Sequence, residues 1–396
     1  MQPLDVCLHG ERVATLAATV DGGYELAYDA EVVARRESIP VPLSQSMPVR
    51  PEPYSPDTTR AFVEGLLPQG PWREELATRL GLDPADGLAL LGALGYDCPG
   101  AVTFGTADEQ SRDAAVATSL VALGGDREKY GLVRRSLGGT WEKPRPGLPS
   151  THVVKPEPDD LPELVANEMF CTAAFRQAGL PAAKATMETI GGRRCLVSQR
   201  FDVVWNGGVP ERLHQETLCQ VLGIAPDPDP GAAEDDAPCF AEAAGLLRAL
   251  GLEREVSTLI HAAFGNYVLG NGDPHGRNFA LLFRGGRIQL ALYDLTSTLV
   301  YGDSNEVGMV LPDDLDVTTY LLGLCRVAEE CGIDPDIFHI QASCALKYVC
   351  DAIQIVAERA EAQGWHEPVI DRIFEVAQDR AGRCAERLLL WDHLDM

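Results

Sequence analysis

The sequence predicts an α+β fold in three successive parts, with boundaries near residues 110 and 222. Residues 1–110 are a small mixed subdomain, 111–222 a β-rich lobe and 223–396 a helical lobe. Short alternating or β-branched runs between glycine turns are typical of strands and recur through the first 222 residues. Prolines and acids at 225–238 are poor material for a core and predict a linker. Apolar residues at helical spacing dominate the rest.

The composition limits the classes of partner and location. The chain has 396 residues, 45% hydrophobic and 23% charged, which excludes wholesale disorder. Its formal net charge of −26 repels phosphate backbones and anionic membranes, so we expect no direct nucleic-acid or membrane partner. No run approaches the roughly 20 apolar residues of a membrane helix, and no signal-peptide pattern is visible. The 11 cysteines without a Cys-x-x-Cys pair predict reduced thiols and a cytoplasmic location.

In the first part, residues 5–9 and 12–16 form a predicted hairpin, and residues 23–28 alternate like a third strand. Residues 58–67 and 72–80 have the apolar spacing of short helices, which Pro68 and Pro71 separate. Residues 100–104 predict one more strand.

The second and third parts differ in their predicted elements. In the second part, strands are expected at 118–123, 129–133, 152–155 and 194–198, with a helix at 162–178 that Gly179 ends. In the third part, helices are expected at 240–250, 256–269, 318–330, 335–360 and 368–390. A strand pair at 278–283 and 288–293, joined by a Gly-Gly turn, interrupts these helices.

The most informative segment is 271–278, NGDPHGRN, which follows the end of a predicted helix. Asp273 lies in this turn-rich loop, Asn278 follows five residues later, and Asp294 ends the strand pair. Phosphoryl transfer from ATP needs a carboxylate that meets the incoming hydroxyl and oxygen ligands for the metal ions on the phosphates. The Asp-x-x-x-x-Asn spacing equals that of the kinase catalytic loop. The Asp-x-x-x-x-Asn spacing alone is common by chance. It becomes informative because Asp294 follows the hairpin, where a kinase has its second metal-binding residue.

Upstream residues could supply the other parts of a kinase. Lys155 ends a β-branched strand, as the phosphate-pairing lysine of kinases does. Glu168 lies on the next helix, on a face that could turn to Lys155 and orient its ammonium group. The segment 136–143, SLGGTWEK, could cover phosphates with its backbone amides. Without the other parts, an ordinary glycine turn would explain this segment as well.

These motifs together resemble the HipA family of serine/threonine kinases, the toxin kinases of bacterial toxin–antitoxin pairs. The segment GDPHGRNF at 272–279 is similar to the family's Asp-Gly-His-x-Lys-Asn-Phe loop, and YD at 293–294 to its metal site. The segment 136–143 resembles its Ser-x-x-Gly-x-Gln-x-Lys phosphate loop, and THVVK at 151–155 its ATP-lysine strand. QRFD at 199–202 resembles its hinge, and HQETLCQ at 214–220 its Gln-Glu-Asp-x-x-Gln segment.

The resemblance implies a bilobal, protein-kinase-like fold that uses ATP and Mg²⁺. By this resemblance Asp273 is the expected catalytic base, Asn278 and Asp294 are magnesium ligands, and Lys155 contacts the phosphates. His275 matches the family's loop histidine and joins Asn278 on the nucleotide side, where its expected role is to brace the loop. The residues expected to cover the phosphates are Gly138, Gly139, Thr140, Trp141, Glu142 and Lys143. Those expected near the adenine are Gln199, Arg200 and Phe201.

Several positions depart from the family pattern. Trp141 stands where the family has Gln, and Pro274 and Arg277 replace the loop's Gly and Lys. The acidic stretch 225–238 replaces a Gly-Gly-Pro segment. Ser136 keeps the hydroxyl that the family autophosphorylates to switch the kinase off.

The leading hypothesis is a kinase of a protein Ser/Thr hydroxyl, with a translation component as one possible acceptor and a small helix-turn-helix antitoxin as partner. Two alternatives stay open: a small-molecule or peptide kinase of a specialised biosynthetic pathway, and a nucleotide-binding pseudokinase scaffold. Retention of Asp273, Asn278 and Asp294 together with Lys155 argues against the scaffold, because an idle site has no physical need for these polar groups.

Overall fold

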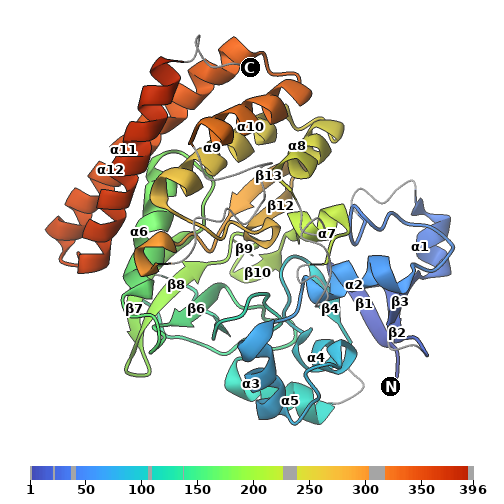
Figure 1. Ribbon diagram of the computed structural model, residues 1–396. Coiled ribbons are helices and arrows are strands. Elements are labelled where there is room, and N and C mark those ends of the chain that lie inside the picture. The colour runs from blue at the N-terminus through green and yellow to red at the C-terminus, as the bar shows by residue number, and fades with distance from the viewer. Residues whose placement is uncertain are drawn as a thin grey trace. The chain divides into compact units, whose positions relative to one another are not determined.

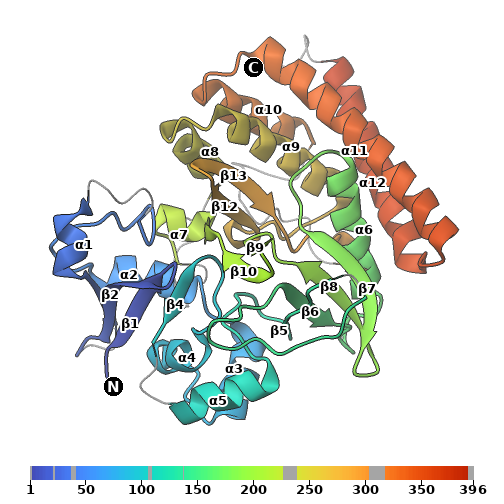
Figure 2. The ribbon, with the colours of Figure 1, turned by 180° about the vertical axis from the view of Figure 1, so that it is seen from behind.

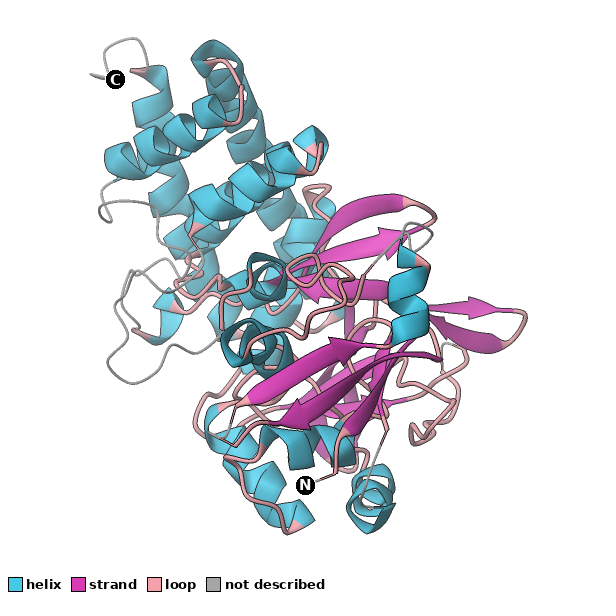
Figure 3. Ribbon diagram, turned by 90° about the vertical axis from the view of Figure 1, so that its right-hand side faces the viewer, coloured by secondary structure: helices cyan, strands magenta, loops and turns pink. Residues whose placement is uncertain are grey.

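The computed structural model describes residues 2–20, 23–36, 42–105, 109–136, 138–225, 239–302 and 317–390. Helices and strands both contribute substantially, which confirms the predicted α+β class (Figure 3). The chain forms two compact units. The first comprises Met1–Pro156, Val197–Asp236 and Ala280–Gln289, and the second Glu157–Leu196, Ala237–Phe279 and Leu290–Met396. The boundaries at 110 and 222 stay a prediction, and most of the acidic stretch 225–238 lies outside the described residues.

An antiparallel sheet opens the first unit and confirms the predicted hairpin. Its order is β3-β2-β1-β4, made of β1 (Leu4–Leu8), β2 (Glu11–Ala18), β3 (Tyr24–Tyr28) and β4 (Val102–Phe104). Val6 pairs with Ala14 on one side and with Phe104 on the other, so β1 is a central strand. Leu4 and Val6 are buried while Asp5 between them is exposed, which is the period-two pattern of a half-buried strand.

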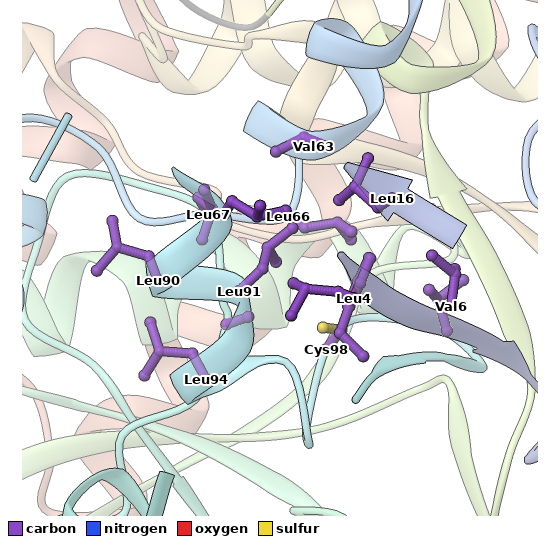
Figure 4. Packing of buried hydrophobic residues seen from close by; sticks show 14 of the residues in the cluster. Leu4, Val6, Leu16, Val63, Leu66, Leu67, Leu90, Leu91, Leu94 and Cys98 are labelled. Carbon is purple, nitrogen blue, oxygen red and sulfur yellow. The ribbon is translucent and has the colours of Figure 1, made fainter. Parts of the chain in front are cut away.

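Five helices of the first unit accompany this sheet: α1 (Ala30–Ala34), α2 (Pro56–Glu64), α3 (Gly70–Leu80), α4 (Gly87–Leu94) and α5 (Glu109–Thr118). Leucines of α4 and of the segment after α2 pack against β1 and β2 (Figure 4). Each buried leucine contributes roughly 1.5–3 kcal/mol relative to exposure. Asp86 begins α4 by accepting a 3.0 Å bond from the Ala89 amide. This cluster anchors the N-terminal part of the first unit.

The predicted strand at 118–123 is wrong. Thr118 ends α5, and the residues after it have no regular structure. Leu120 and Ala122 are nonetheless fully buried in the hydrophobic cluster. Their backbone groups are satisfied there, because the Tyr96 hydroxyl donates to the Leu120 carbonyl (2.7 Å) and the Ala122 amide donates to the Asp97 carbonyl (3.1 Å). The apolar run reflects burial of an irregular segment rather than strand pairing.

The first unit also holds β5 (Tyr130–Leu132), β6 (His152–Pro156), the hairpin of β9 (Val203–Asn206) and β10 (Val209–Arg212), β11 (His214–Thr217) and α7 (Leu218–Leu222). With β7 (Lys184–Ile190), β8 (Arg193–Gln199), β12 (Phe279–Arg284) and β13 (Arg287–Leu292), they give sheets of order β5-β6-β8-β7 and β11-β12-β13. The predicted pair β12–β13 is confirmed. Residues 184–190, 203–212 and 214–217 are strands that the sequence analysis did not identify.

The second unit is mainly helical, and its C-terminal helices lie where the sequence predicted helices. It contains α6 (Leu164–Gln177), α8 (Phe240–Ala249), α9 (Glu253–Leu269), α10 (Val317–Glu330), α11 (Pro335–Gln363) and α12 (Pro368–Leu389). The long helices α11 and α12 lie side by side (Figures 1 and 2), and α9 packs against both. Within the described residues, no helix has the length and apolar character needed to span a membrane.

Candidate active site

The loop that carries Asp273 starts at a fixed helix end. Gly270 has φ +68°, its amide donates to the Tyr267 carbonyl (3.1 Å), and the Asn271 amide donates to the Asn266 carbonyl (2.9 Å). These two bonds form the Schellman motif that typically ends a helix at glycine. A Cβ at Gly270 would lie 2.8 Å from Val376 Cγ1, so both backbone conformation and space require glycine here. The end of α9 thereby sets the direction of the loop.

Neutral side chains hold the backbone just before Asp273. Asn271 and Asn266 are both buried, and the Asn271 Nδ2 donates to the Asn266 Oδ1 (2.9 Å). The Asn271 Oδ1 in turn accepts from the Asp273 amide (3.0 Å), and the Thr298 Oγ1 accepts from the Gly272 amide (2.9 Å). None of these bonds uses the Asp273 carboxylate. The sequence analysis missed Asn271 and Thr298, although an Asn two residues before a loop Asp is a typical Asx-turn signal.

The Asp273 side chain is 57% exposed, and its carboxylate contacts the His275 Nε2. The Asp273 carbonyl accepts from the His275 amide (2.9 Å) and from the Asn278 Nδ2 (3.3 Å). Because the Asn278 Nδ2 is used in this way, its Oδ1 is the atom left to face a cation. Asn278 closes a single 3₁₀ turn, Gly276–Asn278, whose amide bonds fold the loop back on itself.

Asp294 lies two residues beyond the end of β13 and has φ +59°, a left-handed conformation that is uncommon for a residue other than glycine. Such backbone conformations concentrate at functional sites. The preceding Tyr293 donates its amide to the Asn278 carbonyl (3.2 Å) and its hydroxyl to the Arg277 carbonyl. One chain of hydrogen bonds therefore runs from Asp273 through Asn278 to Tyr293, beside Asp294.

The oxygen-bearing side chains along this chain of bonds and next to its end are the carboxylates of Asp273 and Asp294 and the amide of Asn278. In the described ranges, no cluster of three or more His, Cys, Asp or Glu side chains could hold a metal ion. Mg²⁺, however, is commonly held by one or two carboxylates together with water and substrate phosphates, rather than by an all-protein cage. The donor set of Asp294 and Asn278 fits that kind of shared site.

The segment after Asp294 is tied to α6. The Asn167 Oδ1 accepts from the Ser297 amide (2.8 Å), and the Asn167 Nδ2 donates to the Ser297 carbonyl (2.9 Å). Both residues are completely buried, and Glu168, next to Asn167 on α6, is also buried. The sequence analysis singled out Glu168 but did not foresee the contact between Asn167 and Ser297.

The predicted phosphate loop lies in the first unit. Val133 and Glu142 pair through two backbone bonds of 2.8 and 2.9 Å, which close the loop between them. The Gly139 amide donates to the Ser136 carbonyl (2.9 Å), forming a turn in which Gly138 has φ +74° and Ser136 is exposed. The loop is thus a closed hairpin end with an exposed tip.

Trp141 is held within this loop by ring contacts. The Arg134 guanidinium lies 4.1 Å from the centre of the Trp141 ring, a cation–π contact, and the His152 ring meets the Trp141 ring edge-on at 5.1 Å. Lys143 donates to the Ala117 carbonyl near the end of α5, so its ammonium group binds the protein itself. Thr140 and Glu142 complete the loop, and Glu142 pairs with Arg135 at 3.1 Å.

The remaining predicted residues also lie in the first unit. Lys155 is a partly buried residue of β6, Gln199 is exposed at the end of β8, and Phe201 is partly buried after it. Arg200 is buried, and its guanidinium donates to Asp97, Asp202, Ser150 and the Cys98 carbonyl. The structure therefore places Asp273, His275 and Asn278 in one hydrogen-bonded loop of the second unit, and the residue before Asp294 bonds to this loop. The other candidates for nucleotide contact, Lys155 and residues 138–143 and 199–201, lie in the first unit.

Comparisons with known proteins agree on one family. A family model described as the HipA-like C-terminal domain matches residues 121–361, and one described as the HipA N-terminal domain matches residues 4–105. Y4mE of Sinorhizobium fredii, provisionally named a kinase, is 33% identical over 297 residues, covering 66% of this chain and 70% of that protein. The serine/threonine-protein kinase toxin HipA of Shewanella oneidensis is 24% identical over 315 residues, covering 69% of this chain and 71% of that protein.

A solved structure is similar over nearly the whole chain. The complex of HipA, HipB and operator DNA from Shewanella oneidensis contains a chain with a TM-score of 0.74 and 19% identity. The match covers 97% of this chain and 96% of that one. The predicted kinase-like α+β fold is confirmed by this likeness.

Proposed function

Because the chain belongs to the HipA family, we propose that it is a kinase that transfers the γ-phosphate of ATP to a Ser or Thr hydroxyl of a protein. Relatives named as kinases support the phosphotransferase class. The observation that carries the proposal is the hydrogen-bonded chain from Asp273 through Asn278 to Tyr293, beside Asp294. It supports the proposal because it links the loop that carries Asp273 and Asn278 to the strand end that precedes Asp294.

Asp273 is the general base in this proposal. Its carboxylate is more than half exposed, so an incoming hydroxyl can reach it. The acceptor oxygen forms a bond to the γ-phosphorus, the bond from that phosphorus to the β–γ bridging oxygen breaks, and ADP leaves. The hydroxyl proton passes to Asp273. His275 contacts the same carboxylate and braces its orientation.

Asn278 and Asp294 hold Mg²⁺ in this proposal. The Asn278 Oδ1 is available because its Nδ2 is bonded to the Asp273 carbonyl. When bound, Mg²⁺ supplies positive charge that offsets the charge developing on the phosphates. The left-handed backbone at Asp294 fixes the direction in which β13 delivers that residue.

Residues of the first unit bind the nucleotide in this proposal. Lys155 contacts the phosphates, the amides of residues 138–143 cover them, and Gln199 and Phe201 lie near the adenine. The Arg200 guanidinium is left out of the adenine contact, because its donors are already bonded within the protein.

A small helix-turn-helix antitoxin is the partner that we propose. The similar solved structure from Shewanella oneidensis contains HipA with HipB and operator DNA, which supports this class of partner. The net charge of −26 favours DNA contact through such a partner rather than through this chain. A translation component is the proposed acceptor, and the cytoplasm the proposed location.

The test compares Asp273→Asn with Asp294→Ala in the full-length chain. Asp273→Asn should lower phosphate transfer from Mg²⁺–ATP by at least about 100-fold, while nucleotide affinity stays within a few-fold, because only the base is lost. Asp294→Ala should instead weaken nucleotide binding in the presence of Mg²⁺. Intact mass and ADP release report transfer, and calorimetry reports binding.

Asp351→Asn on α11 is the matched control, since Asp351 is 55% exposed and lies outside the loop. It should behave as wild type. Near-normal transfer by Asp273→Asn would remove that residue from the role of base. Nucleotide binding by the wild type without any phosphate transfer would instead favour the nucleotide-binding pseudokinase scaffold.

A further inference from the structure

Asn167 stands out among the buried polar residues of the second unit. It lies in the first turns of α6, is completely buried, and bonds both the amide and the carbonyl of Ser297. Ser297 is three residues beyond Asp294. A side-chain amide that makes two bonds to one residue's backbone fixes both its position and its orientation, as a neighbouring strand would.

Further contacts strengthen this attachment. The Cys171 thiol, one turn along α6, lies 3.5 Å from the Asn167 Oδ1. The Tyr301 hydroxyl donates to the Pro162 carbonyl just before α6 (3.3 Å). Residues 297–301 are therefore bonded to α6 through Asn167 and to the residues just before α6 through Tyr301.

The same segment also holds the catalytic loop. Thr298, next to Ser297, accepts from the Gly272 amide (2.9 Å), and the Leu299 amide donates to the Gly270 carbonyl (3.2 Å). A hydrogen-bonded path therefore leads from Asn167 through residues 297–299 to the residue before Asp273. Asn167 thus holds a segment that begins three residues after Asp294 and that bonds to the residue before Asp273.

We propose that Asn167 is a positioning residue that fixes the magnesium ligand Asp294 and the catalytic loop to α6. This inference rests on the proposed function, because it takes Asp294 as a ligand. Asn167 itself touches neither metal nor substrate. Its neighbour Glu168 lies on the same helix, so a shift of α6 would move that carboxylate and the Asp294 segment together.

A purely structural Asn167 would also stabilise the fold, so the test must separate stability from metal binding. In Asn167→Ala the Ser297 amide and carbonyl lose their partners in a buried site. We expect the Mg²⁺ concentration needed for half-maximal binding of a nonhydrolysable ATP analogue to rise about 10- to 100-fold, as outer-sphere changes typically cause. Without any Mg²⁺, hydrogen exchange of residues 295–299 should also quicken.

Tyr320→Phe is the matched control. It removes a buried bond of 2.7 Å to the Ala263 carbonyl in the same unit without touching residues 294–299. It should lower the melting temperature while leaving the Mg²⁺ requirement and the exchange of 295–299 as in wild type. If Asn167→Ala does not fold, Asn167→Asp serves instead, since it keeps the shape and the acceptor for the Ser297 amide.

The outcomes are distinguishable. An equal Mg²⁺ requirement in wild type, Tyr320→Phe and the Asn167 variant would overturn the positioning role while leaving the proposed kinase intact. A wild-type chain that binds the analogue without any dependence on Mg²⁺ would overturn the proposed metal site itself, and the inference with it.

Discussion

Each unit contains a hydrogen-bonded network that fixes the backbone around it. The network of the first unit is made of charged side chains, and that of the second unit is made of neutral ones. In the first unit, Arg200 donates to Asp97 (2.8 Å) and to Asp202 (2.7 Å), and Arg212 donates to Asp97 (2.6 Å). These four side chains are at most 12% exposed. In the second unit, Asn271 and Thr298 hold the loop that carries Asp273 through neutral groups, and the Asp273 side chain is 57% exposed.

The two networks differ in whether the carboxylate oxygens are all bonded within the protein. A buried charge is tolerated when its partners satisfy it, so every oxygen of Asp97 and Asp202 accepts a bond from an arginine or a backbone amide. A carboxylate proposed as a general base cannot have all its oxygens bonded in this way. Neutral groups fix the backbone around Asp273, and its carboxylate contacts only the His275 ring among the bonds described above.

The pKa values in the first unit follow from this pairing. Burial acts to lower the pKa of Arg200, but attraction to Asp202 and Asp97 outweighs it and raises the pKa. Burial likewise acts to raise the pKa of Asp202, and the Arg200 charge with its hydrogen bonds outweighs it and lowers the pKa. Both groups are therefore charged throughout the neutral range.

The largest expected effect comes from breaking the charged network. Arg200→Ala leaves two buried carboxylates without their main partner and should lower the free energy of unfolding by about 3–5 kcal/mol. Denaturant unfolding measures this. Arg12→Ala, which removes exposed pairs with Asp5 and Asp29, is the control and should cost about 0–1 kcal/mol. Equal losses in the two variants would refute the contrast between buried and exposed charge.

A smaller effect is expected in the predicted phosphate loop, residues 136–143, which belongs to neither network. Trp141→Gln restores the family residue but removes the contacts with Arg134 and His152. A cation–π contact is worth about 0.5–2 kcal/mol. Hydrogen exchange of residues 134–142 should therefore quicken several-fold, and Trp141→Phe should keep much of the protection. Unchanged exchange in Trp141→Gln would mean that the backbone pair of Val133 and Glu142 alone holds the loop.

The smallest effect is expected from acid. Since the folded-state pKa of Asp202 lies below its unfolded value, its contribution to stability is present at neutral pH and is lost as pH falls through the folded pKa, below about pH 4. Unfolding in denaturant should thus become easier from pH 4 downward, and less steeply so in Asp202→Asn. A variant with the same acid slope as wild type would assign the acid sensitivity to other carboxylates.

Regular periodicity made much of the fold predictable. The hairpin at 4–18, the C-terminal helices and the pair β12–β13 each carry a pattern that is local in sequence. The grouping of Asp273 with Asn278 was also a matter of spacing within one loop. The strand prediction for 118–123 was wrong because, in sequence, a buried irregular segment has the same apolar run as a buried strand.

Contacts between residues that are distant in the chain produce no local sequence pattern, so they could not be predicted. Arg200 resembled part of a nucleotide hinge, but its partner Asp97 lies 103 positions earlier in the chain, so nothing near Arg200 indicated its buried role. Asn167 and Ser297 are 130 positions apart, and each is an ordinary polar residue in its own segment. Only the folded backbone brings such pairs within bonding distance.

The tight fit at Gly270 makes the start of the loop depend on α12, which lies about 100 residues further along the chain. Val376 of α12 occupies the space that a side chain at Gly270 would need, and Arg380, one turn further, donates to the Tyr267 carbonyl (2.9 Å) at the same helix end. Contacts from α12 therefore help to fix the position of the helix end from which the loop starts. A bulkier side chain at 376 would press on Gly270 and shift the start of the loop that carries Asp273, without any change in the loop's own sequence. Substitutions in α12 can therefore move Asp273 from outside the motif.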